Sequence, residues 1–146
     1  VILKTASPAE AQAGVKVDLL VRSMCCLRPG VPGVSDNIRV ISIVGRFLEH
    51  SRIYYFRNGG AEEVYLGSAD LMPRNIDRRV EVLFPIQGQQ LIRHMRDEIL
   101  ETYLNDNASA RRLLPDGSYE RLKPGKQQPL NSQNWLITHR PVMRKK

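Results

Sequence analysis

The clearest folding signal of the sequence lies in the stretch HSRIYYFRNGGAEEVYLGS, residues 50–68. Residues 50–56 and 63–68 are rich in the aromatic and β-branched side chains that are typical of strands. Between them lies Asn58-Gly59, and an Asn-Gly pair between two apolar runs is a strong indicator of a tight turn. We therefore predict a β-hairpin over residues 50–68.

Further strands are expected on both sides of this hairpin. Residues 15–22 alternate and then become continuously apolar, which favours a strand that is buried on both faces and continues to about Leu27. Residues 38–44 form another β-branched run, and residues 45–49 are expected to add one helical turn. Residues 79–84 alternate again and stop before a proline, as a strand should.

One long helix is predicted after these strands. In residues 87–105 apolar side chains recur at about every fourth position, which gives an amphipathic helix that covers the sheet. Residues 113–119 contain Pro-Asp-Gly and indicate a second hairpin. Loops are expected over residues 28–36 and 6–14, with a short helix near Pro8 as the alternative for the second. The expected fold is an α/β domain, with α+β as the alternative: a mixed β-sheet flanked by helices.

The composition is that of a globular domain. The chain has 146 residues, of which 42% are hydrophobic and 25% charged, enough to bury a core and too apolar for a disordered tail. No apolar run reaches the roughly 18 residues that cross a bilayer. Because the sequence starts at Val1 rather than Met, we expect residues 1–14 to be a lead-in at the trimmed end of a longer protein. The domain itself is expected over 15–122, and a basic, partly flexible tail over 123–146.

Charge and cysteine content point to a partner and a compartment. Twenty-two basic and fifteen acidic residues give a net charge of +7, which favours a polyanionic partner, with phosphate as the first candidate. Nucleic acid is not expected, because aromatic residues make up only 6% of the chain and supply few stacking platforms. Cys25 and Cys26 are adjacent, so a bridge between them would be strained. We expect a reduced, cytoplasmic protein, with peripheral attachment to a membrane as the alternative.

His50 is the candidate site histidine, since His94 and His139 lie among basic residues, where a solvated role is expected. His50 and Arg52 are two positions apart, so in a strand their side chains point to one face and can meet the same anion. Ser68 on the neighbouring strand leaves room for that anion and offers a hydroxyl group. From these residues alone, a phosphate pocket and a histidine merely satisfied at a strand end both remain open.

The motifs around this site resemble those of known families. His50-x-Arg52 followed by Gly67-Ser68-Ala69-Asp70 is similar to the His-x-Lys and Gly-Ser-x-Asn signature of the phospholipase D-like superfamily. Arg52 replaces the usual Lys, and Asp70 stands where Asn is common. Over residues 15–120, a series of motifs resembles the last domain of the long-chain polyphosphate kinases of bacteria. These motifs are DLLVR (18–22), CCLRPG (25–30), SDNI (35–38), SIVGRFLEHSR (42–52), YLGSAD (65–70) and RNIDRRVE (74–81).

The resemblance implies a phospholipase D-like half-domain of a longer enzyme, an ATP:polyphosphate phosphotransferase that reversibly transfers the terminal phosphate of ATP to inorganic polyphosphate. The histidine that becomes phosphorylated would lie in the preceding, homologous domain, so the chain alone is expected to be inactive. The implied partners are ATP or ADP, polyphosphate, the other domains of the same chain and further copies in a homo-oligomer. Mg²⁺ would arrive with ATP, and no residue of this chain is assigned as a metal ligand.

The resemblance also assigns residues. Arg22 matches the family's nucleotide-phosphate arginine, and His50 matches its second essential histidine. We expect the two to share an anion cradle at the edge of the sheet, because phosphoryl transfer depends on cations that are already in place. Ion pairs of Arg22 with Asp18 or Asp36 are the alternative.

The remaining candidates complete the expected site. An imidazole can exchange a proton near neutral pH, so His50 suits a general acid for the leaving oxygen. Glu81 is expected to orient the imidazole of His50, with an ion pair to Arg78 or Arg79 as the alternative. Further phosphate contacts are expected from three residues, Arg52, Ser68 and Arg79.

Two other functions remain open at this point. The net charge of +7 also suits a non-enzymatic polyanion or nucleic-acid binding module. A phospholipase D-like phosphodiesterase that acts as a homodimer is the other alternative, although it needs a Lys where Arg52 stands. The sequence contains no P-loop, no Gly-x-Gly-x-x-Gly motif and no zinc-binding spacing.

Overall fold

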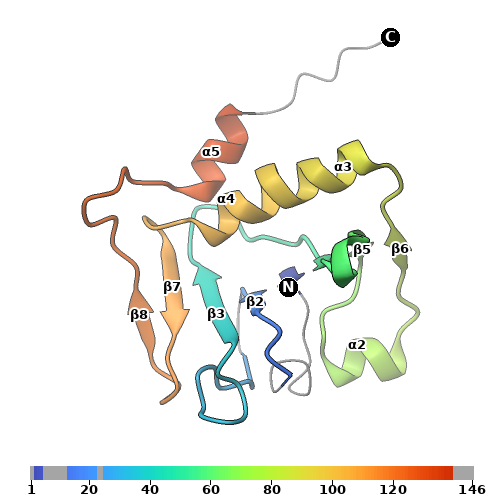
Figure 1. The fold of residues 1–146 in the computed structure, drawn as a ribbon, viewed down its shortest axis with the longest axis horizontal. Coiled ribbons are helices and arrows are strands. Elements are labelled where there is room, and N and C mark those ends of the chain that lie inside the picture. Colours follow the sequence, from blue (N-terminus) through green and yellow to red (C-terminus); the bar gives the residue numbers. More distant parts are fainter. Residues whose placement is uncertain (1, 5–12, 23–24, 140–146) are drawn as a thin grey trace.

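The computed structural model describes residues 2–4, 13–22 and 25–139, and its strands form one mixed sheet in the order β6-β5-β4-β1-β2-β3-β7-β8 (Figure 1). The pairs β1–β4 and β2–β3 are parallel, and the other neighbours are antiparallel. With helices packed against it, this sheet confirms the α/β fold. The strands are β1 (Ile2–Lys4), β2 (Val17–Leu20), β3 (Ile38–Ile43), β4 (Ile53–Phe56), β5 (Glu63–Gly67), β6 (Leu83–Pro85), β7 (Ala110–Leu113) and β8 (Tyr119–Arg121).

The predicted hairpin over residues 50–68 is confirmed as β4 and β5, with Tyr54 opposite Tyr65. The turn between them is the 3-10 segment η1 (Asn58–Gly60). The first strand begins at Ile53, however, and not at His50. A backbone hydrogen bond from Gly67 N to Arg52 O at 3.0 Å lies at this end of the hairpin, and His50 lies beyond it.

Other boundaries differ from the sequence predictions. β2 ends at Leu20 rather than near Leu27, and β6 starts only at Leu83. Residues 45–49 form bends and no helical turn. A six-residue helix, α2 (Pro73–Arg78), was not predicted and packs beside β6 (Figure 1).

The long helix over residues 87–105 is confirmed. It consists of α3 (Gln89–Arg93), the π-helical segment η2 (His94–Leu100) and α4 (Glu101–Leu104), which follow one another without a break (Figure 1). The helix and one face of the sheet share a core of apolar side chains. The fully buried members are Leu20, Ile41, Ile43, Ile53, Tyr55, Val64, Ile92, Leu100, Tyr103, Leu104 and Ala110.

A second, smaller core lies on the opposite face of the sheet, and the loop that follows β2 packs against it. Its buried side chains are Val17, Leu19, Val21, Ile38, Val40 and Leu113, with Cys25 and Leu27 partly buried against them. Cys25 and Cys26 are both free. None of the helices formed by the described residues is long and apolar enough to cross a bilayer.

Within residues 123–146, where a basic, partly flexible tail is expected, α5 (Ser132–Thr138) is folded onto the domain. Ser132 is fully buried, and its backbone N and Oγ both donate to Asp106 Oδ2 at 2.8 Å. Burial works to raise the pKa of Asp106, but hydrogen bonds from Ser132 and Ser109 bring that pKa below its usual value. Asp106 therefore ties α5 to the start of β7.

The expected lead-in over residues 1–14 also contains an element of the sheet. β1 lies between β4 and β2, so the N-terminal strand joins the hairpin half of the sheet to the β2–β3 half. The loop or short helix expected over residues 6–14 falls mostly outside the described residues.

Candidate functional site

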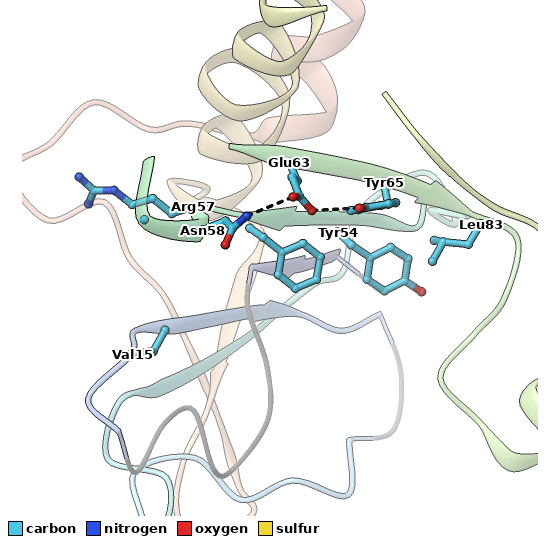
Figure 2. A pocket seen from close by; sticks show the side chains of 9 residues that line it. Val15, Tyr54, Arg57, Asn58, Glu63, Tyr65 and Leu83 are labelled. Carbon is cyan, nitrogen blue, oxygen red and sulfur yellow. Dashed lines mark hydrogen bonds between the residues drawn. The ribbon is translucent and has the colours of Figure 1, made fainter. Parts of the chain in front are cut away.

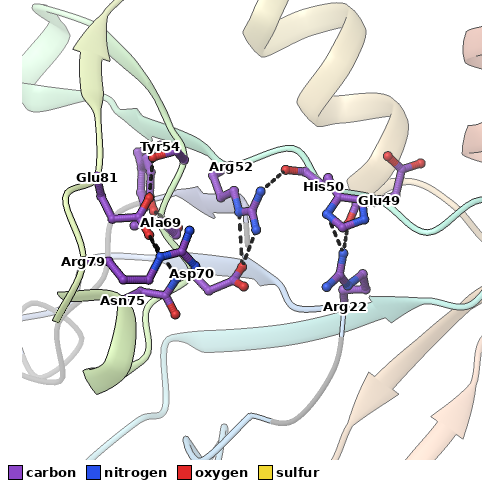
Figure 3. A network of polar contacts seen from close by, with 11 residues as sticks. Arg22, Glu49, His50, Arg52, Tyr54, Ala69, Asp70, Asn75, Arg79 and Glu81 are labelled. Atoms are coloured by element: carbon purple, nitrogen blue, oxygen red, sulfur yellow. Dashed lines mark hydrogen bonds and ion pairs between the residues drawn. The ribbon is translucent and has the colours of Figure 1, made fainter. Parts of the chain in front are cut away.

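Arg22 and His50, the two residues expected to share a cradle, lie together at one end of the sheet (Figure 3). Arg22 follows β2 and His50 precedes β4; the Arg22 Nη1 to His50 Nδ1 distance is 3.4 Å. An arginine only donates hydrogen bonds, so Nδ1 of the ring is the acceptor when this contact is a hydrogen bond. His50 is exposed, and its imidazole is therefore accessible to a solute.

Arg22 has a second neutral acceptor, because its Nη1 donates to the backbone oxygen of Glu49. The alternative ion pairs are not formed. Asp18 is paired with Arg39, whose Nε lies 2.6 Å from Asp18 Oδ1, and Asp36 accepts a hydrogen bond from a loop amide. Neither contact of Arg22 neutralises its positive charge.

Arg52 does not join this pair. Its Nε and Nη2 donate to Asp70 Oδ1 at 3.2 and 3.0 Å, and its Nη1 donates to the backbone oxygen of His50 at 2.6 Å. Burial works to raise the pKa of Asp70, but the hydrogen bonds and charge of Arg52, with the charge of Arg22, lower it below its usual value. Because β4 begins only at Ile53, His50 and Arg52 do not share a strand face as expected. Arg52 braces the His50 backbone while paired with Asp70, and its expected phosphate contact stays a prediction.

Glu81 does not orient His50, contrary to the sequence prediction. Ser68 Oγ donates to Glu81 Oε2, Asn75 Nδ2 donates to Oε1 at 3.1 Å, and Arg79 Nε lies 3.4 Å from Oε1 (Figure 3). The hydrogen bonds from Ser68 and Asn75 lower the pKa of Glu81 below its usual value. The alternative ion pair with Arg79 is the one that forms.

Ser68 and Asn75 connect β5, α2 and β6 around this carboxylate. Ser68 Oγ also accepts from Val82 N at 3.0 Å, which leaves its hydroxyl committed to the turn. Asn75 is buried, and its Oδ1 has no hydrogen-bond partner among the described residues. Ser68, Asn75, Arg79 and Glu81 thus form a cluster beside Asp70, separate from the Arg22–His50 contact.

A cavity lies elsewhere, along β4 and β5. It has a volume of about 700 Å³, and none of the predicted site residues lines it. Figure 2 shows Tyr54, Tyr65 and Leu83 along one wall, with Glu63 accepting hydrogen bonds from Asn58 and Tyr65. The candidate site is the Arg22–His50 pair, because a cationic guanidinium and an exposed imidazole are in contact there. A cavity by itself does not indicate a reaction.

Sequence reasoning missed the residues that hold the backbone next to His50. Gln133 of α5 bonds to Phe47 and to the carboxylate of Glu49. Gln133 and Phe47 are 86 positions apart, so no local pattern could have joined them. Among the described residues, no group of three or more His, Cys, Asp or Glu side chains could hold a metal ion.

The fold and the site define an α/β domain that presents an exposed arginine–histidine contact at one end of its sheet, and comparison with known proteins gives the family. The family model described as "Polyphosphate kinase C-terminal domain 2" matches residues 3–133. The chain therefore belongs to the polyphosphate kinase family and corresponds to that C-terminal domain.

Individual relatives agree with this assignment. The chain is 62% identical over 128 residues to a polyphosphate kinase of Pseudomonas aeruginosa, a match that covers 87% of this chain and 18% of that protein. It is 52% identical over 135 residues to polyphosphate kinase 1 of Chlorobaculum tepidum, covering 92% and 19%. The crystal structure of polyphosphate kinase from Porphyromonas gingivalis matches with a TM-score of 0.85 at 37% identity, over 94% of this chain and 22% of that one. The chain thus spans about a fifth of the length of these relatives.

Proposed function

We propose that this domain forms part of the catalytic core of a longer enzyme that reversibly transfers the terminal phosphate of ATP to inorganic polyphosphate. Family membership supports the reaction, and the 3.4 Å contact between Arg22 and His50 supports the site. That contact is the observation that carries the proposal, since it pairs an exposed imidazole with an arginine that, among the described residues, donates to the ring and to a backbone oxygen.

Arg22 would bind the phosphates of the nucleotide. Its guanidinium has five N–H donors, and the two contacts within the described part of the chain both use Nη1, so the other nitrogens would bind phosphate oxygens. A phosphoryl group in transfer carries charge on its equatorial oxygens, and a cation already in place stabilises that charge without reorganisation. Mg²⁺ would enter bound to ATP, as part of the substrate.

His50 would act at the oxygen that leaves. We propose that a histidine of the preceding domain attacks the terminal phosphorus while the bond from phosphorus to the bridging oxygen of ADP breaks. The Nε2–H of His50 donates a hydrogen bond to that oxygen as its negative charge grows. To give up this proton as a general acid, His50 would take up a proton from solvent at Nδ1 while Arg22 turns from the ring to a phosphate oxygen. The Nε2 proton would then pass to the leaving oxygen, and the ring would end neutral. The phosphoryl group then passes from the phosphohistidine to the terminal oxygen of polyphosphate.

The test uses the full-length protein that contains this sequence. His50→Ala should lower the rate of transfer from ATP to polyphosphate, and of the reverse reaction, about 10²- to 10⁴-fold, as expected for loss of a general acid. His94→Ala is the matched control, because His94 contacts Glu98 on the long helix and should leave the rate unchanged.

Two results would contradict the proposal. One is a wild-type rate in His50→Ala. The other is a wild-type protein that binds polyphosphate without any transfer, which would favour a binding module. The 146-residue chain alone, mixed with ATP, Mg²⁺ and polyphosphate, should give no turnover, because the attacking histidine is proposed to lie outside it.

A further inference from the structure

The segment that presents His50 is not held by regular structure or by the core. Residues 44–52, which connect β3 to β4, contain no helix or strand. The side chains of Phe47 and Leu48 are 46% and 68% exposed, so they do not anchor the segment by burial. The position of this backbone therefore depends on its hydrogen bonds.

Gln133 supplies three hydrogen bonds to this segment, two of them to its backbone. Its Oε1 accepts from Phe47 N at 3.0 Å, and its Nε2 donates to Phe47 O at 2.8 Å and to Glu49 Oε1 at 3.0 Å. The Gln133 side chain is almost fully buried, with 3% of its surface exposed. A primary amide has both a donor and an acceptor, so it can bind the N–H and the C=O of one residue as a neighbouring strand would.

Gly45 makes room for this amide. A Cβ added at Gly45 would lie 2.3 Å from Gln133 Oε1 and 2.7 Å from its Cδ, which is closer than atoms in contact can come. The amide is enclosed between the segment and α5, and any side chain at position 45 would displace it.

The held segment leads directly to the site. The backbone oxygen of Glu49 accepts the hydrogen bond from Arg22 Nη1, and His50 is the next residue. The carboxylate of Glu49, which Gln133 holds, also lies near Tyr103 of the long helix, where burial and this carboxylate together raise the pKa of the phenol. On the other side of Gln133, Ser132 is fixed by the buried Asp106. A continuous chain of contacts therefore runs from the β7 end of the sheet to the Arg22–His50 pair.

We infer that Gln133 is a positioning residue of this site, which sets the Arg22–His50 geometry from the C-terminal helix α5. The inference rests on the proposed function, since it concerns the same pair. Misplacing a catalytic group by about 1 Å can cost about 10²-fold in rate. Loss of the Gln133 amide should therefore lower kcat while the fold persists.

The first experiment compares two variants of α5 in the full-length protein. Gln133→Leu replaces the amide with an apolar side chain of similar size and removes all three hydrogen bonds, so kcat should fall ten- to a hundredfold. Asn131→Ala is the control for helix stability, because Asn131 Oδ1 caps α5 by accepting from Asn134 N at 2.9 Å. It should lower Tm and leave kcat near the wild-type value. If kcat falls in both variants in proportion to the loss of Tm, the inference is overturned.

A double-mutant cycle with Gly45 provides the second experiment. Gly45→Ala should lower kcat as strongly as Gln133→Ala, because the new methyl group pushes the amide away. In the Gln133→Ala background the clash partner is gone, so Gly45→Ala should cost less than twofold more. Fully additive losses would overturn the inference, since they would mean that the two residues act independently.

Hydrogen exchange separates this inference from the proposed function. In the full-length protein, Gln133→Leu should raise amide exchange over residues 46–50, with α5 itself still protected. If the wild-type protein transfers no phosphate, the proposed function fails, and the exchange result still decides whether Gln133 holds the segment. Unchanged exchange in Gln133→Leu would overturn the inference.

Discussion

Arg22 and Arg52 lie at the same end of the sheet, yet their partners differ in kind. Arg22 donates to two neutral acceptors, the backbone oxygen of Glu49 and the ring of His50. Arg52 is bound to the carboxylate of Asp70. The difference teaches that arginines near one motif are not equally available to a phosphate. The charge of Arg22 remains for an anion, whereas the charge of Arg52 is already balanced inside the protein.

The largest effect expected from this comparison is on activity. Arg22→Ala in the full-length protein should lower kcat/KM for ATP about 10²- to 10³-fold, because a fixed cation at the transferred phosphate is lost. Arg39→Ala is the matched control: Arg39 is an exposed arginine paired with Asp18 and should leave kcat/KM unchanged. Steady-state rates over a range of ATP concentrations measure both. Equal losses in the two variants would remove the distinction between Arg22 and a surface arginine.

Arg52→Ala should act on stability. The side chains of Arg52 and Asp70 are only 16% and 27% exposed, so removing Arg52 leaves a mostly buried carboxylate without its cation. We expect the free energy of unfolding of the 146-residue chain to fall by about 1–2 kcal/mol in urea titrations. The double variant Arg52→Ala/Asp70→Ala should lose less than the sum of the two single changes. Additive losses would show that the pair does not interact.

The pH dependence of stability should reflect the two carboxylates of this region. The folded-state pKa values of Asp70 and Glu81 both lie below their usual 3.8 and 4.5. A carboxyl whose pKa is lower in the folded state stabilises the protein above its unfolded pKa, and this contribution disappears as pH falls through the folded pKa. The urea midpoint should therefore be steady from pH 7 to pH 5 and fall below about pH 4. In Asp70→Asn that acid-induced fall should be smaller, and an identical pH profile would contradict the assignment.

The smallest effect is expected at Arg79. Its side chain is 62% exposed and its Nε lies 3.4 Å from Glu81, so Arg79→Ala should leave the urea midpoint unchanged. If Arg79 also meets polyphosphate, KM for polyphosphate should rise about two- to threefold at low salt, and the rise should vanish at high salt. A large loss of stability would instead place Arg79 with Arg52 among the structural ion pairs.

Much of the fold was predictable, because its signals are local. The Asn58-Gly59 turn indicated the β4–β5 hairpin, and the apolar period over residues 87–105 indicated the long helix. The two helices that were missed also carry local signals. Pro73 stands at the first position of α2, and Asn131 caps α5. Both are under eight residues long, too short for an apolar period to be visible.

The site was predictable in part. Motif resemblance pointed to Arg22 and His50, and these two residues lie in contact. The partner of Glu81 was predicted wrongly, because the hydrogen bonds from Ser68 and Asn75 depend on how α2 and β6 turn back toward β5. Gln133 offered no signal, since a glutamine in a short basic tail is ordinarily a solvated residue.

The sequence by itself determined the strands of the hairpin, the long helix and the residue types available for phosphate chemistry, because turn propensity and apolar period act between near neighbours. Only the tertiary structure decided which charges meet. The insertion of β1 between β2 and β4 brings Arg22 to His50, 28 positions away in the sequence. The docking of α5 brings Gln133 to Phe47, 86 positions away. Contacts over such separations form only when the sheet and its helices pack, so they leave no periodic trace in the chain.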